Sequence, residues 1–388
     1  MKCDIVKLDV NTKEYVYNCI YLTEMRDMAA EELKSWIEEH KDELFANDAV
    51  GTGCFSYLPG EVVWAVTKRC NLRCKHCSIS EEDQEELTTE EGFTLIEDAA
   101  KLGHVKFAFT GGEPMLRDDI YDLIEYASSF DMQVVMATNG TLVSNTVAKR
   151  LKEAGLERAA MSIDAIGNAH DDFRGLDGAF EGVIRGVKAC KNAGLAVQLF
   201  AMVTRDNYHE LTKIIKLADD LNLWRIYLIY LIAVGRGKNI SEACLSTDEN
   251  MKFFDFVAKK QTGAKVWLKP ICNPQYWAYL TDKGLVGDGN GFTGCTAGIS
   301  RFHIFPNGDV TPCAYLPVKA GNIREQRFLD IVRDSEMFKA LRARAVTGHC
   351  ATCTHKAICG GCRSRAYATS GDYLAEDPVC SLWDSKEQ

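Results

Sequence analysis

The sequence lacks any apolar run long enough to cross a bilayer. The longest, IYLIYLIAV at 226–234, is far shorter than the roughly 20 residues that a membrane-spanning helix needs, and it is typical of a buried strand. The opening residues, MKCDIVKLDV, also lack the apolar core of a secretory signal. We therefore expect a cytoplasmic protein with no membrane partner.

Proline and excess positive charge are scarce as well. The 388 residues include 8 prolines and 30 glycines, which argues against a collagen-like or disordered composition. The formal net charge of -10 argues against a nucleic-acid partner held by bulk electrostatics. A chain of this length is expected to form two globular domains, or one large domain with extensions.

Cysteine, by contrast, is abundant, with 16 in the chain. A reducing cytosol disfavours structural disulfides, so cysteines that cluster indicate metal or redox chemistry. Three lie at 70–77 and five at 350–380, and two more precede the second group. The remaining six are scattered, and for most of them we expect small buried hydrophobic side chains. They are Cys3, Cys19, Cys54, Cys190, Cys244 and Cys272.

The hydrophobic pattern divides the chain into three parts. Residues 1–60 predict a small α+β appendage, a strand hairpin followed by an amphipathic helix. Residues 61–264 alternate six short apolar strands with amphipathic helices, which predicts a parallel α/β sheet with right-handed crossovers. We favour a partial (β/α)6 TIM-like barrel, although the pattern alone also fits an open doubly wound sheet. Residues 265–388 predict a cysteine-rich iron–sulfur domain that includes a β-hairpin at 301–313.

The first cysteine group, Cys70, Cys74 and Cys77, directly follows the first strand of the barrel. Thiolates suit zinc or an iron–sulfur cluster. Zinc needs a fourth protein ligand, and the nearest candidate is His76, which lies between two of the cysteines and would strain the loop. A four-iron cluster held at three irons leaves the fourth exposed for a small molecule. The spacing therefore favours a cluster over a zinc knuckle.

With its CxxxCxxC spacing, the loop CNLRCKHC at 70–77 resembles the radical S-adenosylmethionine (SAM) superfamily. The resemblance continues in order along the chain, each motif closing a successive predicted strand: TGGEP at 110–114, ATNG at 137–140 and MSID at 161–164. It implies a four-iron cluster on the three cysteines and SAM on the open iron. It also implies reductive cleavage of SAM to a 5′-deoxyadenosyl radical that abstracts hydrogen from substrate, with a flavodoxin- or ferredoxin-like electron donor as partner.

The same resemblance implies the residues that bind SAM. Gly111, Gly112, Glu113 and Pro114 match the element that holds the methionine amino group. Asn139 ends the third strand, and Ser162 and Asp164 match positions that contact the SAM carboxylate and ribose. No catalytic acid or base is assigned.

The C-terminal cysteines give C-x2-C-x5-C-x2-C followed by AEDPVC. A zinc ribbon at 350–362 is the simpler alternative, but it leaves three cysteines without a role. The set resembles the SPASM extension, which implies two auxiliary iron–sulfur clusters. One would use Cys350, Cys353, Cys359 and Cys380, and the other Cys295, Cys313 and Cys362. The family pattern often has one more cysteine shortly after Cys295, and none occurs before Cys313, so this cluster would have an open iron, use a ligand such as His303, or be absent.

Three hypotheses remain for the function. PCAYLPVKAGNIRE at 312–325, the run from Cys359 to Cys380 and GRG at 235–237 resemble SPASM enzymes that oxidise tetrapyrrole propionates in alternative haem pathways. Candidate propionate partners are Arg174, Arg205 and Arg236, since guanidinium groups match carboxylates. The second hypothesis is a maturase that cross-links or epimerises a ribosomally made precursor peptide, recruited by strand addition to the hairpin at 4–21. The third is a non-catalytic iron–sulfur electron carrier or zinc scaffold.

Overall fold

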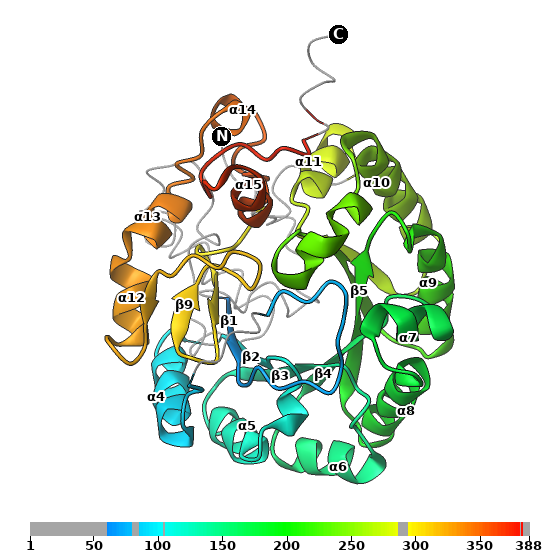
Figure 1. Ribbon diagram of the computed structural model, residues 1–388, viewed down its shortest axis with the longest axis vertical. Coiled ribbons are helices and arrows are strands. Elements are labelled where there is room, and N and C mark those ends of the chain that lie inside the picture. Colours follow the sequence, from blue (N-terminus) through cyan, green and yellow to red (C-terminus); the bar gives the residue numbers. More distant parts are fainter. Residues whose placement is uncertain (1–59, 80–84, 104, 286–293, 381, 383–388) are drawn as a thin grey trace, which may run out of the picture.

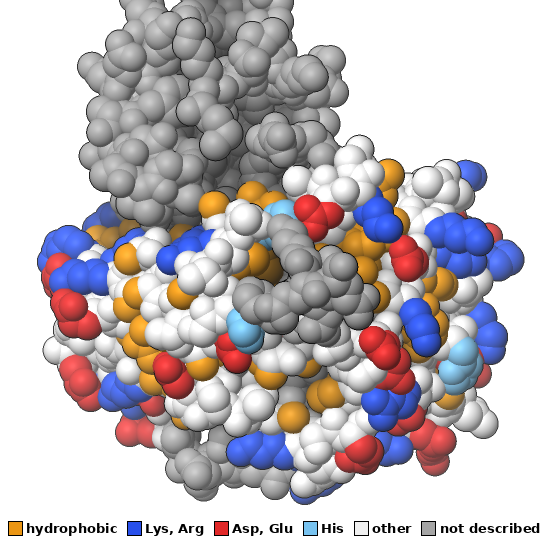
Figure 2. All heavy atoms as spheres, turned by 90° about the horizontal axis from the view of Figure 1, so that it is seen from above, with side chains coloured by type: hydrophobic (Ala, Val, Ile, Leu, Met, Phe, Trp, Pro, Cys, Tyr) orange, Lys and Arg blue, Asp and Glu red, His pale blue; other side chains and the backbone are white. Residues whose placement is uncertain are grey.

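The computed structural model describes residues 60–79, 85–103, 105–285, 294–380 and 382. The appendage predicted at 1–60 lies outside the described residues except for Gly60. Within the described part, every helix is too short or too polar to cross a membrane. Acidic and basic side chains are intermixed over the face that Figure 2 shows.

One sheet of ten strands organises the described residues, in the order β10-β9-β8-β1-β2-β3-β4-β5-β6-β7. Strands β1 to β6 each pair in parallel with the next strand in the sequence, and they curve into the wall of a barrel with helices outside it (Figure 1). They are β1 Glu61–Ala65, β2 Lys106–Thr110, β3 Gln133–Thr138, β4 Arg158–Ser162, β5 Ala196–Val203 and β6 Arg225–Tyr230. The predicted TIM-like α/β barrel is confirmed.

The connecting helices bury their apolar stripes against the outer face of the sheet. Helix α4, Thr89–Ala100, begins after Thr88, whose side chain and that of Glu91 form a reciprocal capping box. The outward residues Val62 and Trp64 of β1 are completely buried beneath such helices. The helices of the barrel are α4 Thr89–Ala100, α5 Ile120–Ser128, α6 Asn145–Glu153, α7 Asn168–Arg174, α8 Ala179–Asn192, α9 Leu211–Asp220 and α10 Thr247–Gln261.

The barrel sheet continues beyond the six predicted units. Strand β7, Trp267–Ile271, pairs in parallel with β6, and β8, Arg301–Ile304, pairs in parallel with β1. Both come from the part of the chain that follows residue 264, so this part contributes a strand to each side of the barrel. The division into domains at 264 stays a prediction.

The predicted hairpin at 301–313 is present. Strand β8 pairs antiparallel with β9, Asp309–Thr311, which also pairs with the short β10, Gly321–Asn322. The remaining helices follow the arc from α12, beside β9, to α11, and α15 lies inside that arc (Figure 1). They are α11 Gln275–Asp282, α12 Phe328–Asp334, α13 Glu336–Arg342, α14 His349–Thr352 and α15 Arg363–Ser370.

Candidate active site

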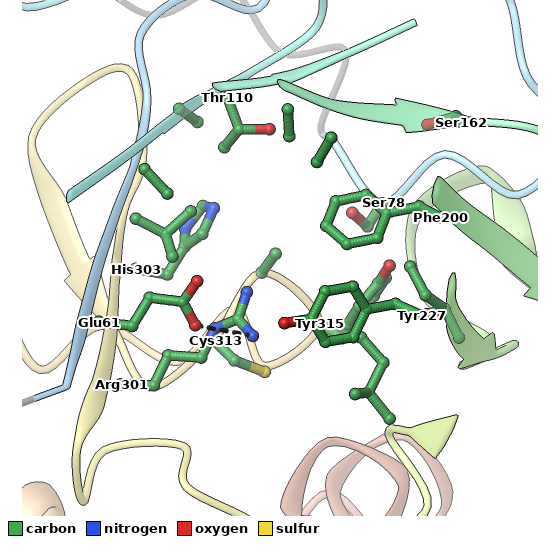
Figure 3. Close-up of a pocket in the computed structure, with 18 of the residues that line it drawn as sticks. Glu61, Ser78, Thr110, Ser162, Phe200, Tyr227, Arg301, His303, Cys313 and Tyr315 are labelled. Carbon is green, nitrogen blue, oxygen red and sulfur yellow. Dashed lines mark ion pairs between the residues drawn. The ribbon is translucent and has the colours of Figure 1, made fainter. Parts of the chain in front are cut away.

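A cavity of about 1450 Å³ runs through the inside of the barrel. A TIM barrel usually fills its interior with bulky side chains. Here the inward positions in the middle of β1 to β4 carry small residues, so the interior stays open: Val63, Ala108, Val135 and Ala160. Phe200 and Tyr227 form the opposite wall, and the Tyr315 hydroxyl points between the two walls (Figure 3).

The loop Cys70, Cys74 and Cys77 lines this cavity at the carboxyl end of β1. Burial raises the pKa of Cys70 to about 11, and the nearby thiols of Cys74 and Cys77 add to the effect. Arg236 holds the loop from the far side of the barrel, with its backbone N–H donating to the carbonyl of Cys77 at 2.9 Å and its Nε to that of Cys74 at 3.0 Å. The three thiols therefore share one end of the cavity.

A buried ion pair lies beside this loop. Arg174 Nε donates to Asp164 Oδ2 at 2.6 Å, and Arg174 Nη1 lies 3.7 Å from Cys74 Sγ. The other carboxylate oxygen of Asp164 accepts from the backbone N–H of Met202 at 2.8 Å. Burial acts to raise the pKa of Asp164, but Arg174 outweighs it and lowers the pKa. Asp164 thus fixes a cation next to the cysteine loop, where it offsets negative charge.

The turn after β2 is fastened directly under the cysteine loop. The N–H of Gly112 donates to the carbonyl of Thr67 at 2.7 Å. A Cβ at Gly112 would lie 2.3 Å from the carbonyl oxygen of Arg69, and one at Gly111 2.4 Å from that of Thr67. Only glycine permits such a close backbone approach. Gly111 and Gly112 also line the cavity.

Glu113 and Pro114, which complete this motif, do not line the cavity. The Glu113 carboxylate is fully buried and accepts from Thr138 Oγ1 at 2.7 Å and from the Asn139 N–H at 2.9 Å. Its pKa is raised by burial. The side chain therefore joins the β2 turn to the β3 turn. Asn139, Ser162 and Asp164 do line the cavity.

The donor set favours a cluster over a single zinc ion. His76, the nearest candidate for a fourth zinc ligand, stacks on Phe173 at 4.7 Å between ring centroids, and burial lowers its pKa to about 3. A four-iron cluster, in contrast, takes each thiolate on a separate iron. The thiols of the loop fit that group.

The C-terminal cysteines fall into two sets. In the outer set, burial raises the pKa of Cys359, and the thiols of Cys380 and Cys350 add to the effect. Backbone N–H groups donate to sulfur at 3.3 to 3.5 Å, as is usual around iron–sulfur clusters. The outer set is Cys350, Cys353, Cys359 and Cys380.

The inner set, Cys295, Cys313 and Cys362, lines the barrel cavity. Burial raises the pKa of Cys362 to about 12, and Cys295 raises it further. Cys272, expected from its isolated position to be no more than a buried thiol, lines the cavity beside them. His303 also lines the cavity, but its electrostatic neighbours are Arg301 and Glu61 rather than these thiols.

The amino-terminal end of the barrel forms a charged floor. Glu61 accepts from Lys106 at 2.7 Å and from Arg301 at 3.2 Å. Burial acts to raise the pKa of Glu61, but these cations outweigh it and lower the pKa to about 2. Cations outnumber carboxylates there: the cavity is lined by Lys106, Arg158, Arg225, Lys269 and Arg301 against Glu61, Asp131 and Glu157.

Two of the three arginines predicted to bind substrate line the cavity. Arg174 and Arg236 lie beside the cysteine loop. Arg205 does not line the cavity, because its guanidinium pairs with Glu249 at 2.7 and 2.8 Å on the surface. The floor cations were missed, since each stands alone in a separate strand.

Comparisons with known proteins agree with this geometry. The family model described as "Radical SAM superfamily" matches residues 64–218, and that described as "Iron-sulfur cluster-binding domain", SPASM, matches 295–362. An AdoMet-dependent heme synthase of Methanosarcina barkeri is 35% identical, covering 83% of this chain and 96% of its own. The synthase of the same name from Nitratidesulfovibrio vulgaris is 37% identical over 82% and 91%. Mycofactocin maturase MftC of Mycolicibacterium smegmatis is 29% identical over 82% of each.

Solved structures show the same fold. Streptococcus suis SuiB bound to S-adenosylmethionine superimposes with a TM-score of 0.71 at 18% identity, covering 94% of this chain and 88% of that one. Barrel, cysteine loop and relatives together define an enzyme class that uses an iron–sulfur cluster with SAM. The chain belongs to the radical SAM superfamily, and a SPASM domain follows its barrel. The family implies a four-iron cluster with SAM and auxiliary iron–sulfur clusters. The hypothesis of a non-catalytic carrier is not supported.

Proposed function

We propose that the protein is an iron–sulfur-dependent oxidoreductase that converts propionate side chains of an iron-bound tetrapyrrole. When bound, the first cluster and SAM would supply a deoxyadenosyl radical, which removes one hydrogen atom from the propionate. The propionate then loses carbon dioxide and one electron to become a vinyl group, and the auxiliary clusters would accept that electron. Cys70, Cys74 and Cys77 hold the first cluster, and a flavodoxin- or ferredoxin-like donor reduces it. The outer and inner sets hold the auxiliary clusters.

We assign the SAM-binding roles from where each residue lies relative to the cysteine loop at 70–77. Gly111 and Gly112 bring backbone polar groups close to the cysteine loop, where they receive the methionine amino group. Ser162 and Asn139 offer side-chain polar groups at neighbouring strand ends. Asp164 acts through Arg174, because both of its oxygens already accept hydrogen bonds. Glu113 positions the two turns without facing the cavity.

The observation that carries the substrate assignment is the cation-rich floor of the cavity. Nε of Arg301 and Nδ1 of His303 are buried without a hydrogen-bond partner among the described residues, although both side chains line the cavity. Buried polar atoms are normally satisfied, so these atoms favour a polar ligand, and Arg301 Nε, which can only donate, favours one that brings an acceptor. A tetrapyrrole carries several carboxylates on a flat ring. The first relatives are named for haem synthesis, and an "Fe-coproporphyrin III synthase" is 32% identical.

The walls of the cavity suit a flat ring. The rings of Phe200 and Tyr227 have centroids 5.2 Å apart and planes tilted by 59°, and they oppose the small residues of β1 to β4 (Figure 3). Aromatic faces pack well on extended π systems. A propionate turned toward the carboxyl ends of the strands would meet Arg236 and Arg174 near the loop. The other propionates would reach Arg301, Lys269 and Lys106 at the floor.

A peptide maturase is the second candidate. Relatives named Mycofactocin maturase MftC and PqqA peptide cyclase are 29% and 28% identical to this chain. The decisive experiment incubates the anaerobically reconstituted enzyme with SAM, reductant and either iron coproporphyrin or a candidate precursor peptide. We expect deoxyadenosine together with a porphyrin lighter by formic acid for each converted propionate. A modified peptide with unchanged porphyrin would contradict the tetrapyrrole assignment.

A further inference from the structure

We infer that Cys272 is the fourth protein ligand of the auxiliary cluster on the inner set, so that this cluster has no open iron. The inference rests on the proposed cluster at Cys295, Cys313 and Cys362, and it names a ligand from outside the sequence region that matches the SPASM family model, 295–362. It replaces the alternatives of an open iron or His303.

The backbone of Cys272 is in an uncommon conformation. The residue directly follows β7 and has φ of 60°, in the left-handed region. Among the described residues only Asn222 and Arg344 share a positive φ without being glycine. Asparagine tolerates this region, whereas cysteine does so at a cost, and such residues concentrate at functional sites. The bend directs the thiol out of the line of the strand.

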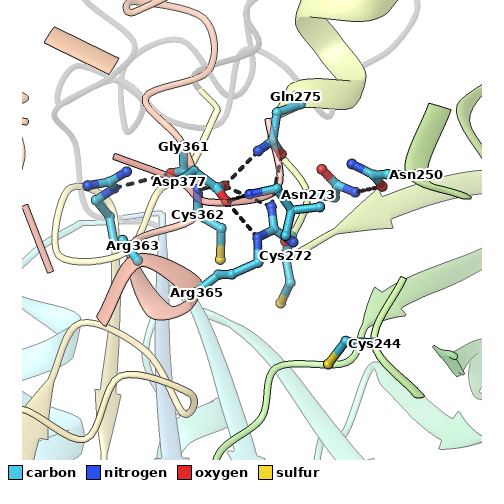
Figure 4. A network of polar contacts seen from close by, with 12 residues as sticks. Cys244, Asn250, Cys272, Asn273, Gln275, Gly361, Cys362, Arg363, Arg365 and Asp377 are labelled. Carbon is cyan, nitrogen blue, oxygen red and sulfur yellow. Dashed lines mark hydrogen bonds and ion pairs between the residues drawn. The ribbon is translucent and has the colours of Figure 1, made fainter. Parts of the chain in front are cut away.

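The bend brings this thiol to the inner set. Cys272 lines the same cavity as its three cysteines and packs against the buried cluster that contains Cys362. In Figure 4 the sulfur atoms of Cys272 and Cys362 point to the same side of the loop. Burial raises the pKa of the Cys272 thiol well above its usual range, and the three thiols of the inner set raise it further. All four sulfur atoms therefore share one neighbourhood.

A buried ion pair fixes the backbones of Cys272 and Cys362 relative to one another. Arg365 donates to Asp377 at 2.7 and 2.8 Å and to the carbonyl of Cys272 at 3.3 Å. The same Asp377 carboxylate accepts from the N–H of Cys362 at 2.7 Å and from Gln275 at 2.6 Å (Figure 4). The network holds two ligand-bearing loops that lie 90 residues apart, and its guanidinium offsets the negative charge of bound thiolates.

Cys244 and Cys190 do not have this arrangement. Cys244 lies away from the inner set in Figure 4, and its Sγ donates to the carbonyl of Leu231 at 3.6 Å. Cys190 is buried in α8, where burial alone raises its pKa to about 12. Among the cysteines that the structure describes, Cys272 is thus the one that completes the inner set. A cluster with four protein thiolates exchanges electrons but offers no iron to a substrate group.

The test uses the full chain with Cys70, Cys74 and Cys77 changed to Ala, because this parent retains only the auxiliary clusters. Cys272→Ala and Cys272→Ser are compared with Cys244→Ala, a matched thiol outside the set. Iron content is measured after anaerobic reconstitution, and the EPR spectrum of the reduced protein is recorded with and without added imidazole. The midpoint potentials of the clusters are measured for each variant.

We expect about eight irons in the parent and in Cys244→Ala, with spectra that imidazole leaves unchanged. Cys272→Ala should lose about four irons, or keep them and respond to imidazole through the freed iron. Cys272→Ser should keep the cluster and shift its midpoint potential. If Cys272→Ala loses all iron because it fails to fold, this shift in the serine variant tests whether residue 272 is a ligand. Unchanged iron, spectra and potentials in both Cys272 variants would overturn the inference. A parent with fewer than eight irons would instead overturn the auxiliary clusters.

Discussion

The barrel and the C-terminal region build their cysteine sites in different ways. In the barrel, one eight-residue loop supplies all three thiols, and each neighbouring turn closes the next strand of a parallel sheet. In the C-terminal region, the inner set and Cys272 come from four separate segments between residues 272 and 362. A salt bridge between Arg365 of α15 and Asp377 connects two of these segments, those of Cys272 and Cys362.

The difference fits the roles that we propose for the two sites. A SAM site must leave one iron and its surroundings open, so it needs few ligands on a short loop at the mouth of a preformed cavity. An electron-transfer site must enclose its cluster, and enclosing it takes ligands from several directions. Asp377 serves both auxiliary sets, because its carboxylate accepts from Cys362 and its backbone N–H donates to Cys350 Sγ at 3.5 Å.

The largest effect is expected from Cys74→Ala in the barrel loop. This change removes one of three ligands and leaves Arg174 without the sulfur that it approaches. We expect deoxyadenosine formation to fall to the background level. Liquid chromatography of the quenched reaction measures it, and Cys190→Ala in α8 is the control. Deoxyadenosine formation near the wild-type rate would refute the role of the loop.

The equivalent change in the outer set, Cys353→Ala, should have a smaller effect. Cleavage of SAM depends on the barrel loop, so part of the deoxyadenosine formation should persist. Conversion of substrate should fail, because the electron relay is incomplete. The ratio of product to deoxyadenosine measures this uncoupling. A ratio equal to that of the wild type would contradict the division of labour between the two regions.

A third change, Asp377→Ala, tests the network that joins the auxiliary sets. It leaves Arg365 as a buried cation without its partner, which costs about 3–5 kcal/mol of the free energy of unfolding. Glu249→Ala breaks the more exposed pair with Arg205 together with a capping hydrogen bond from the Ser246 N–H, and it should cost clearly less than Asp377→Ala. Denaturant unfolding under anaerobic conditions measures both. Equal losses in the two variants would show that the network is not structural.

The smallest effect is expected at the floor of the cavity. Arg301→Met removes a cation that meets a substrate carboxylate, so the KM for iron coproporphyrin should rise about tenfold while kcat changes little. Glu61 keeps Lys106 as its partner, which limits the structural damage. Arg205→Met, on the surface, should leave KM unchanged. An unchanged KM in Arg301→Met would place the carboxylates elsewhere.

Sequence reasoning reached the parts of the molecule that local patterns encode. The cysteine loop, the order of the glycine-rich and asparagine-containing turns, the capped helices and the hairpin at 301–313 all follow from residues close together in the chain. Strand β7 was missed because Lys269 and Pro270 interrupt its apolar pattern. As an edge strand, β7 tolerates proline, which a central strand does not.

Features that depend on distant segments were out of reach. Cys272 stands alone in the sequence, and only the fold brings it to Cys362. The open interior was also hidden, because Ala108 and Ala160 look ordinary within their own strands. The side chain of Glu113 turns toward Thr138 and not toward the cavity, and this orientation could not be deduced from its motif. In each case the deciding contact is tertiary.

The most direct test of the account is transfer of deuterium from substrate to deoxyadenosine. Iron coproporphyrin labelled with deuterium on the propionate carbons is incubated with the reduced enzyme and SAM, and the deoxyadenosine is analysed by mass spectrometry. In this account one cavity holds SAM at the cysteine loop and the porphyrin carboxylates at the charged floor. Deoxyadenosine should therefore gain deuterium as the porphyrin loses carbon dioxide. Unlabelled deoxyadenosine beside intact porphyrin would contradict the account.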